Sequence, residues 1–90
     1  MGDLKRLETI ALEALPLDDE RMQEWKTHLA FWGEASENET LRNENARRFG
    51  EWGKLLKLYL KPIVPGADAL RREAVLLMGL IDGLALRLML

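Results

Sequence analysis

The last stretch of the chain, residues 69–90, carries apolar side chains on two opposite sides of one predicted helix. With about 100° of rotation per residue, one side collects Leu70, Ala74, Leu77, Ile81, Leu84 and Leu88. The other side collects Val75, Gly79, Gly83, Leu86 and Leu90, with Asp82 beside them. A helix that is apolar on both sides has to be covered on both sides. The rest of the chain can cover one of them, so the pattern predicts that a second chain covers the other.

Two earlier helices are predicted on either side of Pro16. The first is expected over about residues 4–15, with Asp3 as its N-cap. It ends before Pro16, because proline disfavours a helical conformation in the residue that precedes it. The second helix is expected over residues 19–36, behind an N-cap at Asp18. Its apolar stripe contains Met22, Trp25, Leu29 and Trp32, flanked by His28 and Phe31.

A third helix is expected over residues 39–61, behind an N-cap at Asn38. Its buried face repeats at spacings of four and three and consists of Leu41, Asn45, Phe49, Trp52, Leu56 and Tyr59. The prolines and glycine of residues 62–66 then break the chain, and Asp68 is the expected N-cap of the last helix. No segment alternates polar and apolar residues for long enough to form a strand. The sequence therefore predicts one all-α domain over residues 1–90, a bundle-like set of four antiparallel helices that dimerises through the last one.

Basic side chains form a row along the third predicted helix, consisting of Arg42, Arg47, Arg48, Lys54, Lys57 and Lys61. Such a row can contact nucleic acid, but the formal net charge of the chain is −2. The helical pairs Glu44–Arg48 and Arg47–Glu51 are also expected to neutralise part of the row. The row is therefore interpreted as a solvated helix face.

The composition indicates whether the chain folds, in which cellular compartment it functions and whether it crosses a membrane. With 48% apolar residues the chain can build a core, and disorder is not expected. It contains no cysteine, which excludes disulfides and fits the reducing cytoplasm. The first residues lack the basic and apolar pattern of a signal peptide. Asp82 and Arg87 interrupt the final apolar stretch, and because a charge at the bilayer centre costs about 2.5–3.5 kcal/mol, no membrane span is expected.

Residues able to carry catalysis are scarce. The chain has one histidine and no phosphate-binding glycine loop, and Ser36 lacks the surroundings of a nucleophilic serine. His28 follows Glu24 by one helical turn, but two such ligands do not make a metal site. His28 is therefore expected to be a partly buried neutral side chain. The sequence predicts no enzyme, no metal and no cofactor.

The aromatic residues gather on two successive predicted helices and comprise Trp25, Phe31, Trp32, Phe49, Trp52 and Tyr59. Aromatic side chains at helical spacing are typical of a core, because each buries a large area. Aromatic walls with a few polar groups are also typical of a small-molecule pocket. The pattern favours a core but leaves a pocket open, and one residue can serve both.

Three residues of the last predicted helix are unusual. Gly79 and Gly83 lie one turn apart, and since each costs about 1 kcal/mol of helix propensity, close approach of a partner helix would offset them. Asp82 has no residue able to pair with it one turn away on its own helix. Its partner is therefore expected from elsewhere: His28, an indole N–H, an arginine, a second subunit, water or a ligand.

Three stretches resemble the C-terminal regulatory domain of TetR-family transcriptional regulators, in the betaine-repressor-like branch. They are LPLDDERMQEWKTHLAFWGEA (15–35), LRNENARRFGEWGKLLKLYL (41–60) and LMGLIDGLALRLML (77–90), the last containing the motif L-I-D-G-L-A. The resemblance implies an all-α domain that binds a small effector in its interior and forms a homodimer. It assigns the ligand cavity to Trp25, Trp32, Phe49, Trp52 and Tyr59, and we expect His28, Leu29 and Met78 to contribute to the same cavity. It assigns the dimer interface to Val75, Gly79, Asp82, Gly83, Leu86 and Leu90.

Two parts of that family pattern are missing from these 90 residues. The N-terminal helix-turn-helix is absent, so operator DNA is expected to be bound only by a domain outside this chain. The final helix of the family is absent as well, and the sequence looks like a fragment. The alternative hypothesis is a helical association module with a solid core and no ligand.

Overall fold

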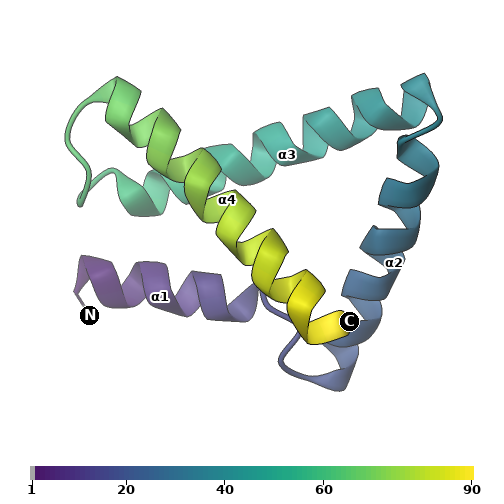
Figure 1. Cartoon of the computed structure of the whole chain (residues 1–90). Coiled ribbons are helices and arrows are strands. Elements are labelled where there is room, and N and C mark those ends of the chain that lie inside the picture. The colour runs from purple at the N-terminus through teal and green to yellow at the C-terminus, as the bar shows by residue number, and fades with distance from the viewer. Residues whose placement is uncertain (1) are drawn as a thin grey trace.

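The computed structural model describes residues 2–90 and contains four helices (Figure 1). They are α1 (Asp3–Glu13), α2 (Asp19–Ala35), α3 (Glu39–Leu60) and α4 (Ala67–Met89). No strand occurs among the described residues. The all-α prediction with four packed helices is therefore confirmed.

Two of the four predicted N-caps are confirmed. The Asp18 carboxylate accepts a hydrogen bond from the backbone N–H of Arg21 at 2.8 Å, and α2 begins at the next residue. The Asn38 side-chain oxygen accepts from the backbone N–H of Leu41 at 3.1 Å at the start of α3. Both caps satisfy N–H groups that the first helical turn leaves without a partner.

The other two N-caps were predicted wrongly. α1 begins at Asp3, so Gly2 is its N-cap and no side chain caps it. α4 begins at Ala67, two residues earlier than predicted, behind Gly66 with φ of 91°. Glycine adopts this positive φ without a clash, so the chain turns at Gly66 and the helix starts at once. Asp68 lies inside the first turn, where its carboxylate pairs with Arg71.

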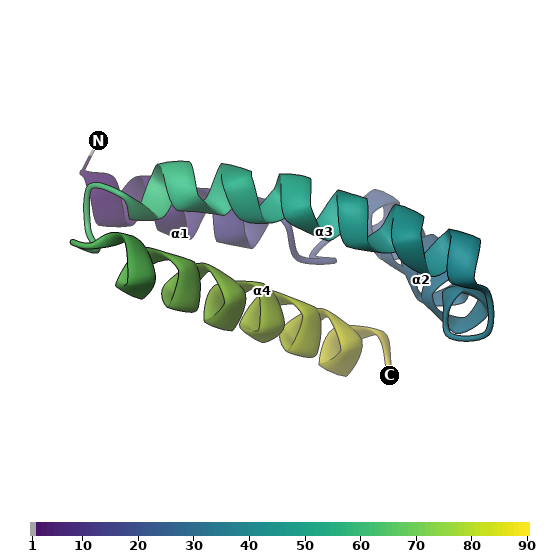
Figure 2. The same cartoon turned by 90° about the horizontal axis from the view of Figure 1, so that it is seen from above.

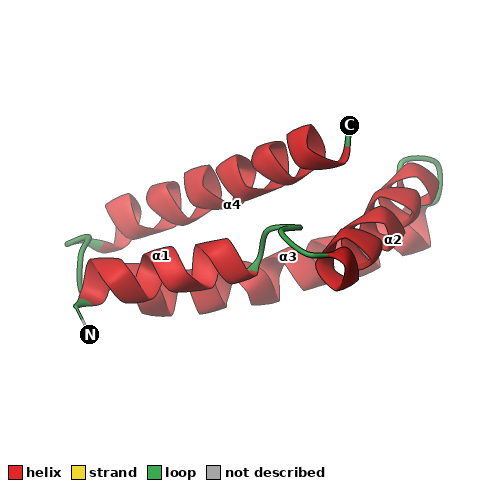
Figure 3. Cartoon of the chain, turned by 90° about the horizontal axis from the view of Figure 1, so that it is seen from below, coloured by secondary structure: helices red, strands yellow, loops and turns green. Residues whose placement is uncertain are grey.

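The helices form a flat molecule whose principal extents are 38 × 30 × 16 Å. α1 lies along α3 in the opposite direction, while α2, α3 and α4 outline a triangle (Figure 1). α4 forms a separate layer on one side of α1 and α3 (Figure 2), and the view from below shows the same separation (Figure 3). α2 stands across the ends of the other helices, so the arrangement departs from a regular antiparallel bundle.

The core is small and lies where α4 crosses the other helices. Its main cluster joins Leu15, Ile81 and Ala85, with Trp25 and Trp52 packed against it. Leu56 of α3 is fully buried. Gly53 is buried too, and a Cβ added there would lie 3.4 Å from the Sδ of Met78. A Cβ at this position would thus come into contact with the α4 side chain.

α4 is covered on one side and bare on the other. Its covered side carries Ala74, Ile81 and Ala85. We use the term outer face for its exposed side, which consists of Val75, Leu76, Gly79, Leu80, Gly83, Leu84 and Leu88. Leu84 and Leu88 had been predicted on the covered side. Leu84 lies outside because it is rotated by about 100° from Ala85, which occupies the contact, and Leu88 because it lies at the end of α4. No helix within residues 2–90 is long and apolar enough to cross a membrane.

Candidate functional site

A pocket of about 330 Å³ opens between α2, α3 and α4 at the end of α1. The residues that line it are Glu13, Ala14, Arg21, Glu24, Trp25, His28, Phe31, Trp32, Asn45, Arg48, Phe49, Trp52, Ile81 and Asp82. All four helices or their ends contribute to it. The pocket therefore depends on the tertiary arrangement and not on any single element.

Aromatic rings form a continuous wall of the pocket. The ring of Trp25 meets those of His28 and Trp32 edge to face, with centroids 5.8 and 5.9 Å apart. Trp32 in turn packs against Phe49 of α3, with centroids 5.9 Å apart. Spacings of three and four residues place the α2 rings on one helix face. The wall thus runs from the open end of the pocket on α2 across to α3.

Hydrogen bonds fix two of these rings. The Nε1–H of Trp25 donates to the carbonyl oxygen of Ala14 at 2.7 Å. The Nε1–H of Trp32 donates to Oδ1 of Asn45 at 3.1 Å. Both indole donors are therefore occupied by the protein itself, and these rings offer the pocket their carbon faces.

Asp82 is the polar group on the α4 side of the pocket. Its side chain is half-buried, and none of the described residues forms a hydrogen bond or ion pair with it. Burial raises the pKa of this carboxyl, and the nearby His28 partly offsets that increase. His28, one of the partners left open by the sequence, lines the same pocket without bonding to Asp82. Asp82 remains available to accept hydrogen bonds.

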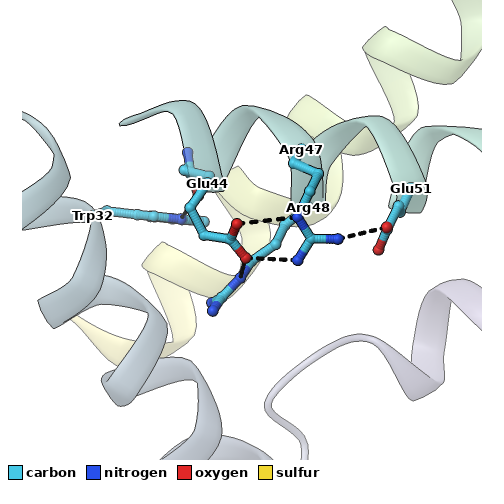
Figure 4. Close-up of polar contacts among 6 residues, drawn as sticks. Trp32, Glu44, Arg47, Arg48 and Glu51 are labelled. Carbon is cyan, nitrogen blue, oxygen red and sulfur yellow. Dashed lines mark hydrogen bonds and ion pairs between the residues drawn. The ribbon is translucent and has the colours of Figure 1, made fainter. Parts of the chain in front are cut away.

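Arg48 lies on the α3 side of the pocket and is held by two contacts. Its guanidinium lies 4.8 Å from the centre of the Phe31 ring, and its Nε lies 3.3 Å from a carboxylate oxygen of Glu44. Arg47 binds the same Glu44 and also Glu51, each at 2.6 Å (Figure 4). These charge-assisted hydrogen bonds, above all the one from Arg47, lower the pKa of Glu44 to about 2.

This network confirms the predicted pairs Glu44–Arg48 and Arg47–Glu51. Arg42, also in the basic row, donates to the carbonyl oxygens of Ala35 and Ser36 at 3.4 and 3.2 Å, at the end of α2. Half of the row is thereby engaged within the chain, which favours the interpretation as a solvated helix face over a nucleic-acid surface.

The structure gathers five of the eight predicted ligand residues in the pocket: Trp25, His28, Trp32, Phe49 and Trp52. His28 is exposed there instead of partly buried, because it lies at the open side. Leu29 is half-buried on α2 outside the lining, and Met78 packs where α4 passes Gly53. Tyr59 lines a separate hollow between α1 and α3, since the two turns of helix after Trp52 carry it about 10 Å away.

The six predicted interface residues divide between two environments. Val75, Gly79, Gly83 and Leu90 are exposed. Leu86 is half-buried, and Asp82 lines the pocket of its own chain. The exposed four remain candidates for contact with a second subunit.

Several lining residues escaped the sequence analysis. Asn45 carried a usable signal, because it is a polar residue in an otherwise apolar repeat, and it receives the Trp32 hydrogen bond. Glu13 and Ala14 carried none, because only the packing of α1 against the other helices brings them to the pocket. No group of three or more metal-ligating side chains occurs within the described part of the chain.

The family described as BetI-type transcriptional repressor, C-terminal, matches residues 4–90. No curated protein and no solved structure matches the chain.

Proposed function

Because the chain belongs to the BetI-type C-terminal domains of TetR-family transcriptional repressors, a non-enzymatic regulatory family, we propose that it senses a small effector and joins two repressor subunits. The effector binds in the pocket between α2, α3 and α4. Its occupancy controls operator binding by a helix-turn-helix domain in the cytoplasm. The main observation behind this proposal is the pocket, which has an aromatic wall and the carboxyl group of Asp82, to which no described residue bonds.

The size and lining of the pocket support a small organic effector. Its volume of about 330 Å³ lies at the lower end of the range for small-molecule sites, about 300–1,000 Å³. The indole donors of Trp25 and Trp32 are occupied, whereas Asp82 has no partner among the described residues. Such a site suits an apolar or cationic molecule, because aromatic faces attract cations and the carboxylate can balance the positive charge of the ligand.

Two probes of the same shape test the class of effector. Phenyltrimethylammonium is a cation, and tert-butylbenzene is its neutral carbon analogue. We expect the cation to bind more tightly in calorimetry, and Asp82→Asn to weaken the cation about five- to tenfold while leaving the neutral probe unchanged. Tyr59→Phe, which lies in the other hollow, is the matched control and should change neither affinity.

The outcomes separate the two hypotheses for this domain. Binding of both probes with equal affinity would mean an apolar effector. Binding of neither would contradict the proposed sensing role and favour the alternative, a helical association module without a ligand.

The bare outer face of α4 supports association of two copies. Val75, Leu76 and Leu80 are 68%, 60% and 58% exposed, and Leu84 and Leu88 continue the patch. A Cβ added at Gly79 or Gly83 would meet nothing within 4 Å. The glycines therefore leave a shallow groove beside the leucines, into which the leucines of a second copy would fit.

The total surface of the chain supports the same conclusion. The accessible area is 6397 Å², whereas a folded monomer of this length exposes about 5,400 Å². The excess, about 1,000 Å², is close to the roughly 800 Å² that one partner buries in a standard interface. Covering the outer face would thus bring the exposed area to that of an ordinary folded protein.

Sedimentation equilibrium of the 90-residue chain tests the association. We expect a dimer for the parent, and a weaker one by at least tenfold for Leu80→Lys, which places a charge in the patch, and for Gly83→Leu, which fills the groove. Leu58→Lys is the matched control, because Leu58 is 69% exposed on α3, away from the outer face. A monomeric parent, or a dimer that persists in both variants, would show that the outer face is not the interface.

A further inference from the structure

We propose that Trp25 is a positioning residue that couples occupancy of the pocket to the end of α1, through the hydrogen bond from its indole N–H to the carbonyl oxygen of Ala14. The proposal rests on the proposed function in one respect, since it assumes that a molecule enters the pocket. The hydrogen bond itself, 2.7 Å long, is present without one.

The acceptor of this bond lies at a sensitive point of the chain. The last carbonyl groups of a helix have no partner within the helix. Ala14 follows the last residue of α1 as its C-cap, and its carbonyl oxygen receives the Trp25 indole N–H. Ala14 and Glu13 also line the pocket, as does Trp25. Donor and acceptor therefore both belong to the pocket wall.

α1 packs along its length through partly buried side chains only: it lies against α3, and Ala11 contacts the core cluster. None of its eleven residues is buried, and Leu4 and Leu12 are 71% and 46% exposed. The firm anchor is at its end, where Leu15 is 8% exposed and packs with Ile81 and Ala85 of α4. The hydrogen bond from Trp25 adds a directed polar contact to this packing at the end of the helix.

The position of the indole depends on the rings that a ligand would touch. Trp25 is packed edge to face between His28 and Trp32. A hydrogen bond weakens steeply as its donor tilts away from the acceptor. A molecule that packs among these rings braces Trp25, so its N–H stays directed at Ala14 and the end of α1 opens less often.

Hydrogen exchange of the α1 backbone amides tests the hydrogen bond without any ligand. We expect Trp25→Phe to speed exchange at residues 10–15 about three- to tenfold. Benzothienylalanine at position 32 is the matched control, because it keeps the ring that packs against Trp25 and removes only the other indole hydrogen bond of α2, which ends on Asn45 of α3. It should leave the α1 amides unchanged.

A second variant keeps the test informative if Trp25→Phe fails to fold. Benzothienylalanine at position 25 retains the two-ring shape and lacks the N–H. Faster α1 exchange in this variant supports the coupling role of the hydrogen bond. Unchanged α1 exchange in it overturns the proposal, because the ring alone would then hold the helix end.

Phenyltrimethylammonium at saturation tests the coupling itself. We expect exchange at residues 10–15 to slow at least threefold in the parent, and to stay constant in the benzothienylalanine variant with the probe bound. Binding in calorimetry without any change at α1 overturns the coupling and leaves the proposed function intact. If neither this probe nor its neutral analogue binds, the proposed function and the coupling are contradicted together, while the exchange rates without ligand still decide whether the hydrogen bond anchors α1.

Discussion

At the scale of single residues, Asp82 combines two properties that are usually kept apart. It is a half-buried carboxylate on an apolar helix, and no partner among residues 2–90 bonds to it. Burial penalises the charged form, so the pKa of Asp82 is raised above its ordinary value of 3.8. A residue kept in this state costs stability, which is consistent with a role in the pocket.

The stability lost by burying the Asp82 carboxylate depends on pH. Below pH 3.8 the carboxyl is protonated in the folded and the unfolded chain, and it carries no penalty. As the pH rises past that value, the unfolded chain ionises first, so the folded state loses stability until its own raised pKa is passed. We expect Asp82→Leu to change the free energy of unfolding at pH 7 by less than about 1 kcal/mol, or to increase it, because no charge partner is left unpaired.

Urea denaturation at pH 3.5 and pH 7 measures this difference. The free energy of unfolding of Asp82→Leu should increase relative to that of the parent as the pH rises. A loss of several kcal/mol at pH 7 would instead reveal a buried partner of Asp82, in a second subunit or elsewhere.

At the scale of the helix, features set by residues nearby in the sequence were predicted correctly, and features set by packing between helices were not. The caps at Asp18 and Asn38 depend on residues three positions away, so the sequence contains everything needed to find them. The start of α4 depends on the conformation of Gly66, which spacing alone does not reveal. The covered side of α4 depends on which neighbour fits against Ala85, and that contact is set by the other helices.

Two glycines make a matched test of this local chemistry. Gly66 has φ of 91°, where a Cβ is strained, so Gly66→Ala is expected to destabilise the fold by about 1–3 kcal/mol. Gly33 lies inside α2 with nothing within 4 Å of an added Cβ. Gly33→Ala is expected to stabilise by about 0.5–1 kcal/mol, because alanine is the better helix former.

Chemical denaturation of the two variants gives both values. If Gly66→Ala proved neutral, the turn before α4 would have to adopt a different conformation in solution. If Gly33→Ala destabilised, α2 would have a contact at that position that the isolated chain lacks.

At the scale of the whole molecule, helical spacing predicted one wall of the pocket and the family resemblance implied a cavity, but neither predicted how the helices close around it. Helical spacing placed Trp25, His28 and Trp32 on one side of α2. The opposite wall, with Asn45 on α3 and Ile81 on α4, exists only because three helices close a triangle. The angles between helices depend on packing across the chain, which periodicity along one helix does not encode.

Because the molecule is only 16 Å thick, we expect its stability to depend on association. A molecule with so small a core buries little apolar surface by itself, and covering the outer face of α4 would add substantially to that burial. We expect the midpoint of thermal unfolding to rise with protein concentration in the parent, because binding of a second copy stabilises the folded state alone. Calorimetry over a hundredfold range of concentration measures the shift. Leu80→Lys should unfold at a lower temperature that does not depend on concentration.

The edge-to-face contact between Trp25 and Trp32, 5.9 Å between ring centres, also has an optical consequence. Two indoles at that separation share their electronic excitation, and the coupling depends on their mutual angle. We expect this pair to contribute to the near-ultraviolet circular dichroism of the domain together with Trp52, so a molecule that packs against the pocket wall should change that signal. Trp25 and Trp32 are thus intrinsic chromophores in the wall of the proposed effector site, and binding can be followed without an added label.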